Sequence, residues 1–501
     1  MVQRPDIIIF NPDQWRGDVL GHMGNPAAVT PNLDRAAGQD FVSFRNAFCQ
    51  NPVCTPSRCS FMTGWYPHVR GHRTMFHMLH PERGEPNLLK ILKDAGYFVW
   101  WGGKNDLVPA EDGYDAYCDV KFRPTDADFA RWGHKRRGFF ASDRGDSWRG
   151  RPDSDTYYSF FVGRLDTEGD SLYCDPDWQN VLGAIDFIRG YRGDKPLCIY
   201  LPLTYPHPQY AVEEPWFSMI DRAKLPPRIP APRDWTGKPS LLKGIHQRQN
   251  MTTWTEPRWN ELRATYYGMC ARVDEQFGRV MAALRDAGRY DRSAVFFFSD
   301  HGDFTGDYGL VEKTQNTFED CLTRVPFLVK PPAGAGSRPR ISDALVELVD
   351  FPATVFDLAG IQPNYTHFGR SLLPLVAGQT DEHRDAVFCE GGRLHGERHC
   401  MELESPSNQE PGGLYWPRVG LQSREGPEHT KAVMVRTATH KYVHRLYEPD
   451  ELYDLRSDPG QQHNRITDSA LAGELAALRH RLLTFYLETC DVVPFQTDRR
   501  W

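Results

Sequence analysis

Short apolar segments alternate with helical patterns over most of this 501-residue chain, and that alternation constrains its fold more than any other feature. Five segments are apolar at consecutive positions, as strands buried on both faces of a parallel sheet are: residues 6–10, 97–101, 197–203, 294–298 and 325–329. The intervening residues carry helical periods, most clearly at 86–95 and at 258–287, just before Gly288. The pattern predicts an α/β fold in which a large, mostly parallel sheet is sandwiched by helices.

Two regions depart from this alternation. Residues 121–177 are polar, rich in Arg, Asp, Trp and Tyr, and weakly periodic, which indicates a long insertion over the sheet. After residue 385 the pattern changes to short strands, at 386–389, 432–435, 441–446 and 451–455, followed by a helix near 470–488. We therefore expect a main α/β domain over residues 1–385 and a small antiparallel C-terminal subdomain over residues 386–501.

Composition excludes several classes of partner. The formal net charge of -7 is mild and indicates neither a nucleic-acid nor a membrane partner. No stretch approaches the roughly 18 apolar residues of a membrane-spanning helix. The N-terminal residues lead directly into the strand at 6–10 without a signal peptide, so a cytoplasmic location is expected. The 11 cysteines are scattered without CxxC pairs, which argues against a disulfide framework and a zinc cluster.

One cysteine stands in an unusual setting. Pro56 suits the first turn of a helix and Thr55 could cap it, which would place Cys54 at the positive end of the helix dipole. Arg58 then lies in the first turn, where a cation is tolerated best if an anion lies between it and the helix end. A lone cysteine is more often a buried packing residue. Here the nucleophile, the helix terminus and the guanidinium converge on one spot.

Polar side chains also follow two of the predicted strands. Asp13 and Gln14 come after the strand at 6–10, and Asp300 and His301 come after the strand at 294–298. Ligands gather at the carboxyl ends of strands in open α/β folds. Two carboxylates, an amide oxygen and an imidazole would make an oxygen-rich site for a divalent ion. A single Asp after a strand is more often a helix cap, so a metal site requires that the two pairs of residues meet in space.

These motifs resemble the formylglycine-dependent sulfatases of the alkaline phosphatase superfamily. Cys54-Thr55-Pro56-Ser57-Arg58 matches the family's C-x-P-S-R signature. The resemblance implies that a separate maturation enzyme oxidises Cys54 to formylglycine, and that this residue joins Asp13, Gln14, Asp300 and His301 around one divalent metal ion. The Asp-Gln pair is similar to that of choline sulfatases and phosphonate monoester hydrolases. Calcium is the first choice of metal, with manganese as the competitor.

Three further groups match the family's catalytic set. Lys104 resembles the lysine of the G-K-W-H segment, His207 the histidine of the P-H-P segment, and Lys313 the lysine that follows D-H-G. Taken alone, a lysine is usually a solvated surface group and a histidine usually a structural one. With Cys54 and Arg58 they complete the catalytic set that the resemblance implies. Segments at 31–34, 348–356 and 451–455 also look like sulfatase landmarks, so the resemblance covers most of the chain.

Asp106 departs from the family pattern, which has a histidine at that place. A carboxylate beside an anionic ester would repel it, so we expect Asp106 to bind a substrate hydroxyl or amine, or to orient Lys104. His72 is a second candidate for substrate binding. It follows the nucleophile helix, as His68 and His77 do, although surface or packing roles suit all three equally well.

The resemblance implies a sulfatase that hydrolyses a small sulfate ester, such as a carbohydrate or aryl sulfate, to inorganic sulfate and an alcohol. The nearest alternative is a phosphonate monoester or phosphodiester hydrolase with the same machinery. A metal-dependent phosphatase would need a Ser or Thr nucleophile and ligands for a second metal, and a binding protein on this scaffold would require an unmodified Cys54. The sequence leaves the oligomeric state open, and a homo-oligomer is compatible with it.

Overall fold

A nine-stranded sheet forms the centre of the molecule. The computed structural model describes residues 4–139, 145–401 and 406–500. The strand order is β11 (Arg340–Glu347), β2 (Val42–Phe48), β10 (Phe327–Lys330), β8 (Ser293–Phe298), β1 (Asp6–Asp13), β6 (Leu197–Pro206), β3 (Phe98–Trp101) and β4 (Val120–Lys121), with β9 (Arg324–Val325) paired to β2. Most neighbours are parallel, so the predicted α/β class is confirmed.

The exception to the parallel order is the segment at 325–329. It forms two short strands, β9 and β10, which flank Pro326, and both run antiparallel to their neighbours. Proline lacks the N–H that a continuous ladder requires, which explains the break. Because β10 is antiparallel to both β8 and β2, those two strands point the same way. Their carboxyl ends therefore lie at the same edge of the sheet as those of β1, β6 and β3.

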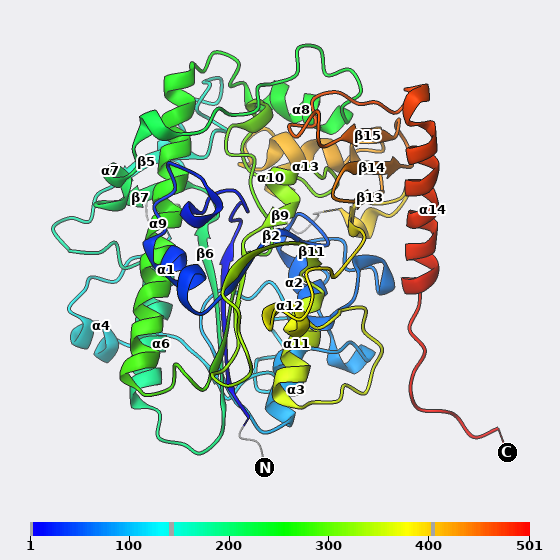
Figure 1. Ribbon diagram of the computed structural model, residues 1–501. Coiled ribbons are helices and arrows are strands. Elements are labelled where there is room, and N and C mark those ends of the chain that lie inside the picture. Colours follow the sequence, from blue (N-terminus) through cyan, green and yellow to red (C-terminus); the bar gives the residue numbers. More distant parts are fainter. Residues whose placement is uncertain (1–3, 140–144, 402–405, 501) are drawn as a thin grey trace.

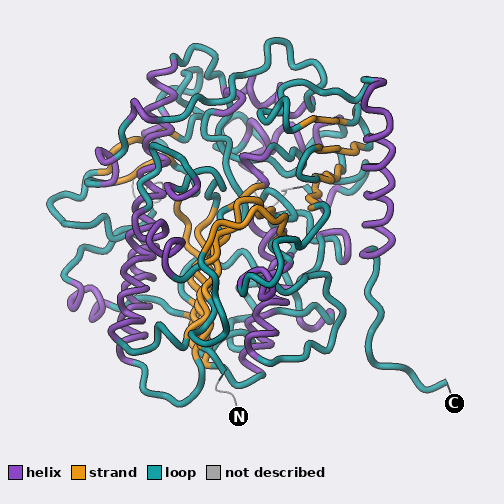
Figure 2. Tube along the Cα trace, viewed as in Figure 1, coloured by secondary structure: helices purple, strands orange, loops and turns teal. Residues whose placement is uncertain are grey.

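Helices cover both faces of this sheet, and alternation along the strands assigns each face its core (Figures 1 and 2). Ile8 and Phe10 of β1 join the core beneath α1, α6 and α9, whereas Ile7 and Ile9 join the core beneath α2, α3 and α11. The helix bounds are α1 (Pro31–Gln39), α6 (Pro176–Gly190), α9 (Glu256–Asp286), α2 (Cys54–Thr63), α3 (Leu88–Asp94) and α11 (Asp350–Ala359). Two apolar faces on each central strand explain why these strands read as continuous apolar runs in the sequence.

The longest helix of the described chain, α9, lies along one face of the sheet. Its 31 residues end where the sequence predicted, just before Gly288, whose φ of 65° is left-handed. Glycine adopts that conformation without a steric penalty, so the chain can turn away after the last helical residue.

A separate antiparallel sheet follows the main domain, in the order β12 (Val387–Gly391), β13 (Ala432–Arg436), β14 (His440–Arg445) and β15 (Glu451–Asp454). The final helix, α14 (Ala472–Thr489), covers it (Figure 1) and packs Leu482 and Phe485 against Phe388. The predicted small antiparallel sheet is therefore confirmed. Met434 shares an apolar core with Ile9 of β1, so the two sheets pack against each other. The boundary at residue 385 stays a prediction.

The predicted insertion at 121–177 contains α4 (Asp126–Trp132) and β5 (Phe161–Leu165), with residues 140–144 outside the described part. Strand β5 pairs with β7 (Tyr210–Glu213), just beyond the end of β6. The Tyr158 hydroxyl donates to the carbonyl of Pro411, and the rings of Phe160 and Tyr415 lie 5.3 Å apart. The insertion thus contacts the connection between β12 and β13.

The remaining helices are shorter connections around these layers. They are α7 (Trp216–Met219), α8 (Ser240–Gln249), α10 (Asp320–Thr323), α12 (Leu373–Val376) and α13 (Trp416–Gln422). None of the helices in the described ranges combines the length and apolar character needed to cross a membrane.

Candidate active site

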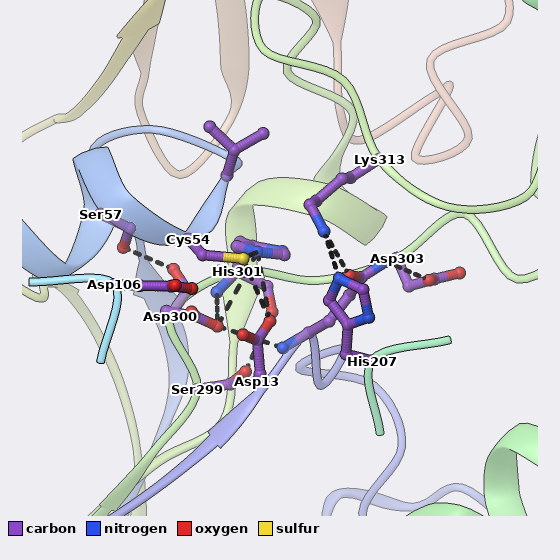
Figure 3. A network of polar contacts seen from close by, with 12 residues as sticks. Asp13, Cys54, Ser57, Asp106, His207, Ser299, Asp300, His301, Asp303 and Lys313 are labelled. Carbon is purple, nitrogen blue, oxygen red and sulfur yellow. Dashed lines mark hydrogen bonds and ion pairs between the residues drawn. The ribbon is translucent and has the colours of Figure 1, made fainter. Parts of the chain in front are cut away.

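Four adjacent parallel strands end around one buried cluster of polar side chains (Figure 3). Asp13 is the last residue of β1, Asp300 follows β8, His207 follows β6 and Lys104 follows β3. Gly103 makes the last of these turns feasible. Its φ is 107°, and a Cβ there would lie 2.2 Å from the carbonyl oxygen of Pro202. Strand order in the sheet therefore brings together residues that lie far apart in the sequence.

Helix α2 directs its N-terminus at this cluster, and Cys54 is its first residue. The predicted cap at Thr55 is wrong, because Val53 holds the N-cap position in an extended conformation and no side chain caps the helix. Asn51 stabilises the segment before the helix, because its Oδ1 accepts a hydrogen bond from the Val53 amide at 3.1 Å. Cys54 thus lies in the first turn, where the helix dipole favours negative charge.

The Cys54 thiol is buried and surrounded by charged groups. Its Sγ lies 3.2 Å from Nε2 of His301, 3.4 Å from Oδ1 of Asp13 and 3.5 Å from Nζ of Lys104. Burial and then Asp13 raise the pKa of the thiol far above its ordinary value. A thiol that holds its proton is a poor nucleophile.

The donor atoms of Asp13, Cys54, Asp300 and His301 all lie within 4.8 Å of one another, and all four residues are buried. Nδ1 of His301 lies 2.9 Å from the carbonyl of Gly302 and donates to it, which leaves the lone pair of Nε2 directed at the cluster. Carboxylate oxygens with one imidazole suit a hard or borderline divalent ion. The residues present therefore fit the metal that the sequence predicted.

Gln14 lies beside these four groups, but its side chain is engaged elsewhere. Oε1 accepts from Nζ of Lys313 at 2.7 Å, and Nε2 donates to Asp303 at 2.5 Å. Asp303 is itself held by the hydroxyl of Tyr210 at 2.7 Å. The structure thus brings Gln14 to the cluster with its amide oxygen on a lysine, and a bond from Gln14 to the metal stays a prediction.

Arg58 ties the two carboxylates together from the protein interior. It is fully buried, with Nη2 at 3.1 Å from Asp13 and 2.8 Å from Asp300. Nη1 donates to Oδ1 of Asn11 at 3.0 Å. The sequence predicted that an anion would lie beside this guanidinium. Asn11 was missed as its anchor, although its position two residues before Asp13 on the same strand was a usable signal.

Lys104 lies between two carboxylates. Its Nζ is 2.5 Å from Asp13 and 2.7 Å from Asp106. Burial alone would lower the pKa of Lys104, but Asp106 and Asp13 raise it well above its ordinary value. The contact with Asp106 favours its orienting role on Lys104 over the binding of a substrate hydroxyl or amine, and both roles stay predictions.

His207 and Lys313 form a second pair at the opposite side of the cluster (Figure 3). Nζ of Lys313 lies 2.9 Å from Nε2 of His207, and the Lys313 side chain is buried beside Glu312. Burial and then Lys313 lower the pKa of His207 well below its ordinary value, so the ring is neutral. A neutral imidazole next to an ammonium is suited to passing one proton to a departing oxygen.

His72 is the one candidate whose contacts point away from the cluster. Its Nε2 pairs with Glu85 at 3.2 Å and its Nδ1 donates to the carbonyl of His77. Although burial lowers the pKa of His72, Cys59 and Glu85 raise it to about 11. None of these contacts, within the described ranges, joins His72 to Cys54, and a substrate contact by His72 stays a prediction.

Comparisons with a family model, with related sequences and with solved structures agree with one another. The family described as Sulfatase matches residues 5–361. The chain is 25% identical to the multifunctional alkaline phosphatase superfamily protein PehA of Trinickia caryophylli, over 97% of this chain and 96% of that one. It is 27% identical to an arylsulfatase of Clostridium perfringens, over 77% of this chain and 81% of the relative. The phosphonate monoester hydrolase of Agrobacterium radiobacter has a similar fold, with a TM-score of 0.73 at 22% identity over 97% of this chain and 96% of that one.

Proposed function

The chain belongs to the sulfatase family, and from that membership we propose that its reaction uses a formylglycine made from Cys54 beside one divalent metal ion. Membership makes the chain a sulfuric ester hydrolase of the alkaline phosphatase superfamily. The observation that carries the proposal is the position of Cys54. Its Sγ lies within 3.5 Å of an imidazole, a carboxylate and an ammonium at the start of a buried helix.

The modification explains why a cysteine occupies this position. When hydrated, the aldehyde supplies two hydroxyl groups on one carbon, one to attack sulfur and one whose loss of a proton expels sulfate and restores the aldehyde. An unmodified alcohol or thiol would lack the second hydroxyl needed for release. The conversion requires a separate maturation enzyme as a partner of the newly made chain.

We assign the metal to Asp13, Asp300, His301 and the modified residue 54, with Gln14 as a further ligand if its amide turns away from Lys313. The ion would supply positive charge for the attacking oxygen and the ester oxygens. Calcium suits the oxygen-rich set, and manganese is the alternative because the imidazole is a borderline ligand. Replacing the usual second aspartate by Gln14 removes one negative charge from the site.

Positively charged side chains surround the place where a sulfate group would lie. Nζ of Lys104 lies 3.5 Å from Sγ of Cys54, Lys313 interacts electrostatically with the same residue, and Arg58 binds both carboxylates. Donors fixed before the reaction stabilise charge on the transferring group without reorganising. His207 and Lys313 are the pair from which the leaving oxygen takes its proton.

Phosphonate monoester or phosphodiester hydrolysis is the second candidate. It is favoured by the Asp13-Gln14 and Asp300-His301 pairs and by the fold likeness to two phosphonate monoester hydrolases, with TM-scores of 0.73 and 0.71. All three ester classes carry one negative charge, so the same cationic groups would serve each of them.

Parallel assays of matched aryl esters separate the two candidates. The sulfate, the phenylphosphonate and the phosphodiester of one phenol share a leaving group, so differences in kcat/KM report the transferring group alone. We expect the highest kcat/KM for the sulfate, and complete loss of all three activities in Cys54→Ala. A higher kcat/KM for the phosphonate would replace the sulfatase proposal by the second candidate.

A further inference from the structure

Two histidines and a glutamate meet on the C-terminal part of the molecule, in a group distinct from the Cys54 site. His395 lies in the turn after β12, Glu425 follows α13, and His429 ends the short helix Pro427–His429. Their donor atoms lie within 4.8 Å of one another. We call these three residues the His395 cluster.

The three donor atoms form a nearly equilateral triangle. Nδ1 of His395 lies 3.1 Å from Oε2 of Glu425, Nε2 of His429 lies 3.2 Å from the same oxygen, and the two ring nitrogens are 3.2 Å apart. Zinc–nitrogen and zinc–oxygen bonds of about 2.0–2.1 Å place tetrahedral ligands roughly 3.3 Å from each other. The triangle therefore has the dimensions of one face of a tetrahedral metal site.

Hydrogen bonds alone cannot satisfy all three edges of this triangle. Each ring nitrogen carries at most one hydrogen and an ionised carboxylate only accepts, so at most two hydrogens are available for three edges. If both nitrogens donate to Glu425, the third edge brings two donors into contact. A cation above the triangle would instead accept one lone pair from each of the three atoms.

The surrounding residues hold the ligands in place. Oε1 of Glu425 is bound by Arg393 at 3.2 Å, and Oε2, which lies beside the histidines, also accepts from the Gly396 amide at 3.3 Å. The His395 ring is stacked on Tyr447 at a centroid distance of 3.8 Å, and the His395 amide donates to the Tyr447 hydroxyl. Partners that orient ligands in this way are typical of metal sites.

Backbone pairing brings the two histidines together. The Arg393 amide donates to the carbonyl of His429 at 2.9 Å, and Arg393 forms a parallel bridge with Thr430. The Arg393 guanidinium opposes a cation here, but it lies on the oxygen that faces away from the histidines.

We propose that the His395 cluster is a second metal site, specific for a zinc-like transition-metal ion, with solvent as the fourth ligand. Both His395 and Glu425 are exposed, so a fourth position toward water is accessible. The site would join the turn after β12 to the segment before β13 and would stabilise that junction. This inference is independent of the reaction at Cys54.

The junction lies next to the active-site segment. Nδ2 of Asn316 donates to the carbonyls of Glu428 and Thr430, on either side of His429, at 3.1 and 2.9 Å. Asn316 is three residues after Lys313. A metal ion at the His395 cluster would therefore stabilise the position of the segment from Lys313 to Asn316.

A neighbouring group, formed by Glu397, His399 and Cys400, has similar distances between its donor atoms but is less suited to bind a metal ion. Both oxygens of Glu397 are bound by Arg73, at 3.0 and 3.1 Å. A carboxylate shared with a guanidinium in this way has little capacity left for a cation.

Cobalt(II) binding tests the proposal, because tetrahedral cobalt with histidine ligands absorbs visible light. Metal-stripped wild-type enzyme, His395→Ala and Glu425→Gln are dialysed against cobalt(II), and bound metal and absorption are measured. Both substituted side chains are exposed, so the variants should fold. We expect each variant to bind about one cobalt ion per chain less than the wild type and to lose the tetrahedral absorption.

His463→Ala is the matched control, since His463 is an exposed histidine of the same subdomain paired with Asp458. It should bind as much cobalt as the wild type. Equal cobalt content in the wild type, His395→Ala and Glu425→Gln would overturn the proposal. Asp300→Asn separates the two sites, because it should lose metal at Cys54 and keep the tetrahedral absorption.

Discussion

Nζ of Lys313 lies 2.9 Å from Nε2 of His207, and the geometry around the pair fixes which atom holds the proton. Nδ1 of His207 donates to the carbonyl of Pro208 at 2.6 Å, so Nε2 carries the lone pair and accepts from the lysine. The same ammonium donates to Gln14 and pairs with Glu312. In the proposed mechanism, the proton that Lys313 shares with His207 would pass to the leaving oxygen.

Leaving-group dependence should reveal this role. In His207→Gln we expect kcat/KM for alkyl sulfates to fall by about 10²-fold or more, because an alkoxide needs a proton to depart. Nitrophenyl sulfate should lose much less, since nitrophenolate leaves unprotonated. His463→Gln serves as the control with an exposed histidine. An equal loss for both leaving groups would argue that His207 only shapes the site.

Asp106 should act through Lys104, since the two are 2.7 Å apart. Asp106→Asn removes the charge but keeps the shape, and we expect a loss of roughly tenfold or more in kcat/KM from a misplaced ammonium. Asp112→Asn, an exposed carboxylate of the same loop, should behave as the wild type. Unchanged kinetics of Asp106→Asn on the true substrate would remove Asp106 from the mechanism.

Chelation should abolish activity if the Cys54 cluster holds a metal. Prolonged dialysis against EDTA should remove the ion, and calcium should restore at least as much activity as manganese. Asp300→Asn should need a metal concentration about 10- to 100-fold higher for half-maximal activity. Full activity in enzyme shown by elemental analysis to be free of metal would contradict this assignment.

Arg272 packs against the end of β6, the strand that precedes His207. Its guanidinium is fully buried between Asp175 at 2.8 Å and Glu213 at 3.0 Å and lies against the Tyr205 ring, two residues before His207. Arg272→Met would leave two buried carboxylates without their partner and should lower the free energy of unfolding by about 3–5 kcal/mol.

Urea denaturation measures this loss, with Arg279→Met as the control. Arg279 lies on the same helix and pairs with Glu275 at 2.9 Å near the surface, where such pairs contribute about 0–1 kcal/mol. A similar change in both variants would show that the buried pair has no special role.

Much of the main sheet and of the active-site cluster could be predicted from the sequence, because both depend on local sequence patterns. The apolar strands at 6–10 and 294–298 fixed which polar residues stand at strand ends, and the parallel order of those strands brought Asp13 to Asp300. The strand β2 was missed because nearly half of its residues are polar, and its partner β11 was missed because polar residues interrupt its first half. Neither shows the continuous apolar run by which buried strands were recognised.

Long-range packing determined what could not be predicted. The amide of Gln14 turns toward Lys313, 299 residues away in the sequence, and no local pattern encodes that contact. The helix start at Cys54 depends on the extended conformation of Val53, which Asn51 stabilises. Glu425 and His429 of the His395 cluster are four residues apart, but His395 lies 30 residues from Glu425, so no short motif contains all three.

Peptide mass spectrometry of active enzyme is the most direct test of the central claim. If Cys54 is the source of the nucleophile, the peptide that contains residue 54 should be about 18 Da lighter than its cysteine form, as conversion of a thiol to an aldehyde requires. The fraction converted should rise and fall with sulfatase activity across preparations. Fully active enzyme with an intact thiol at position 54 would contradict the account.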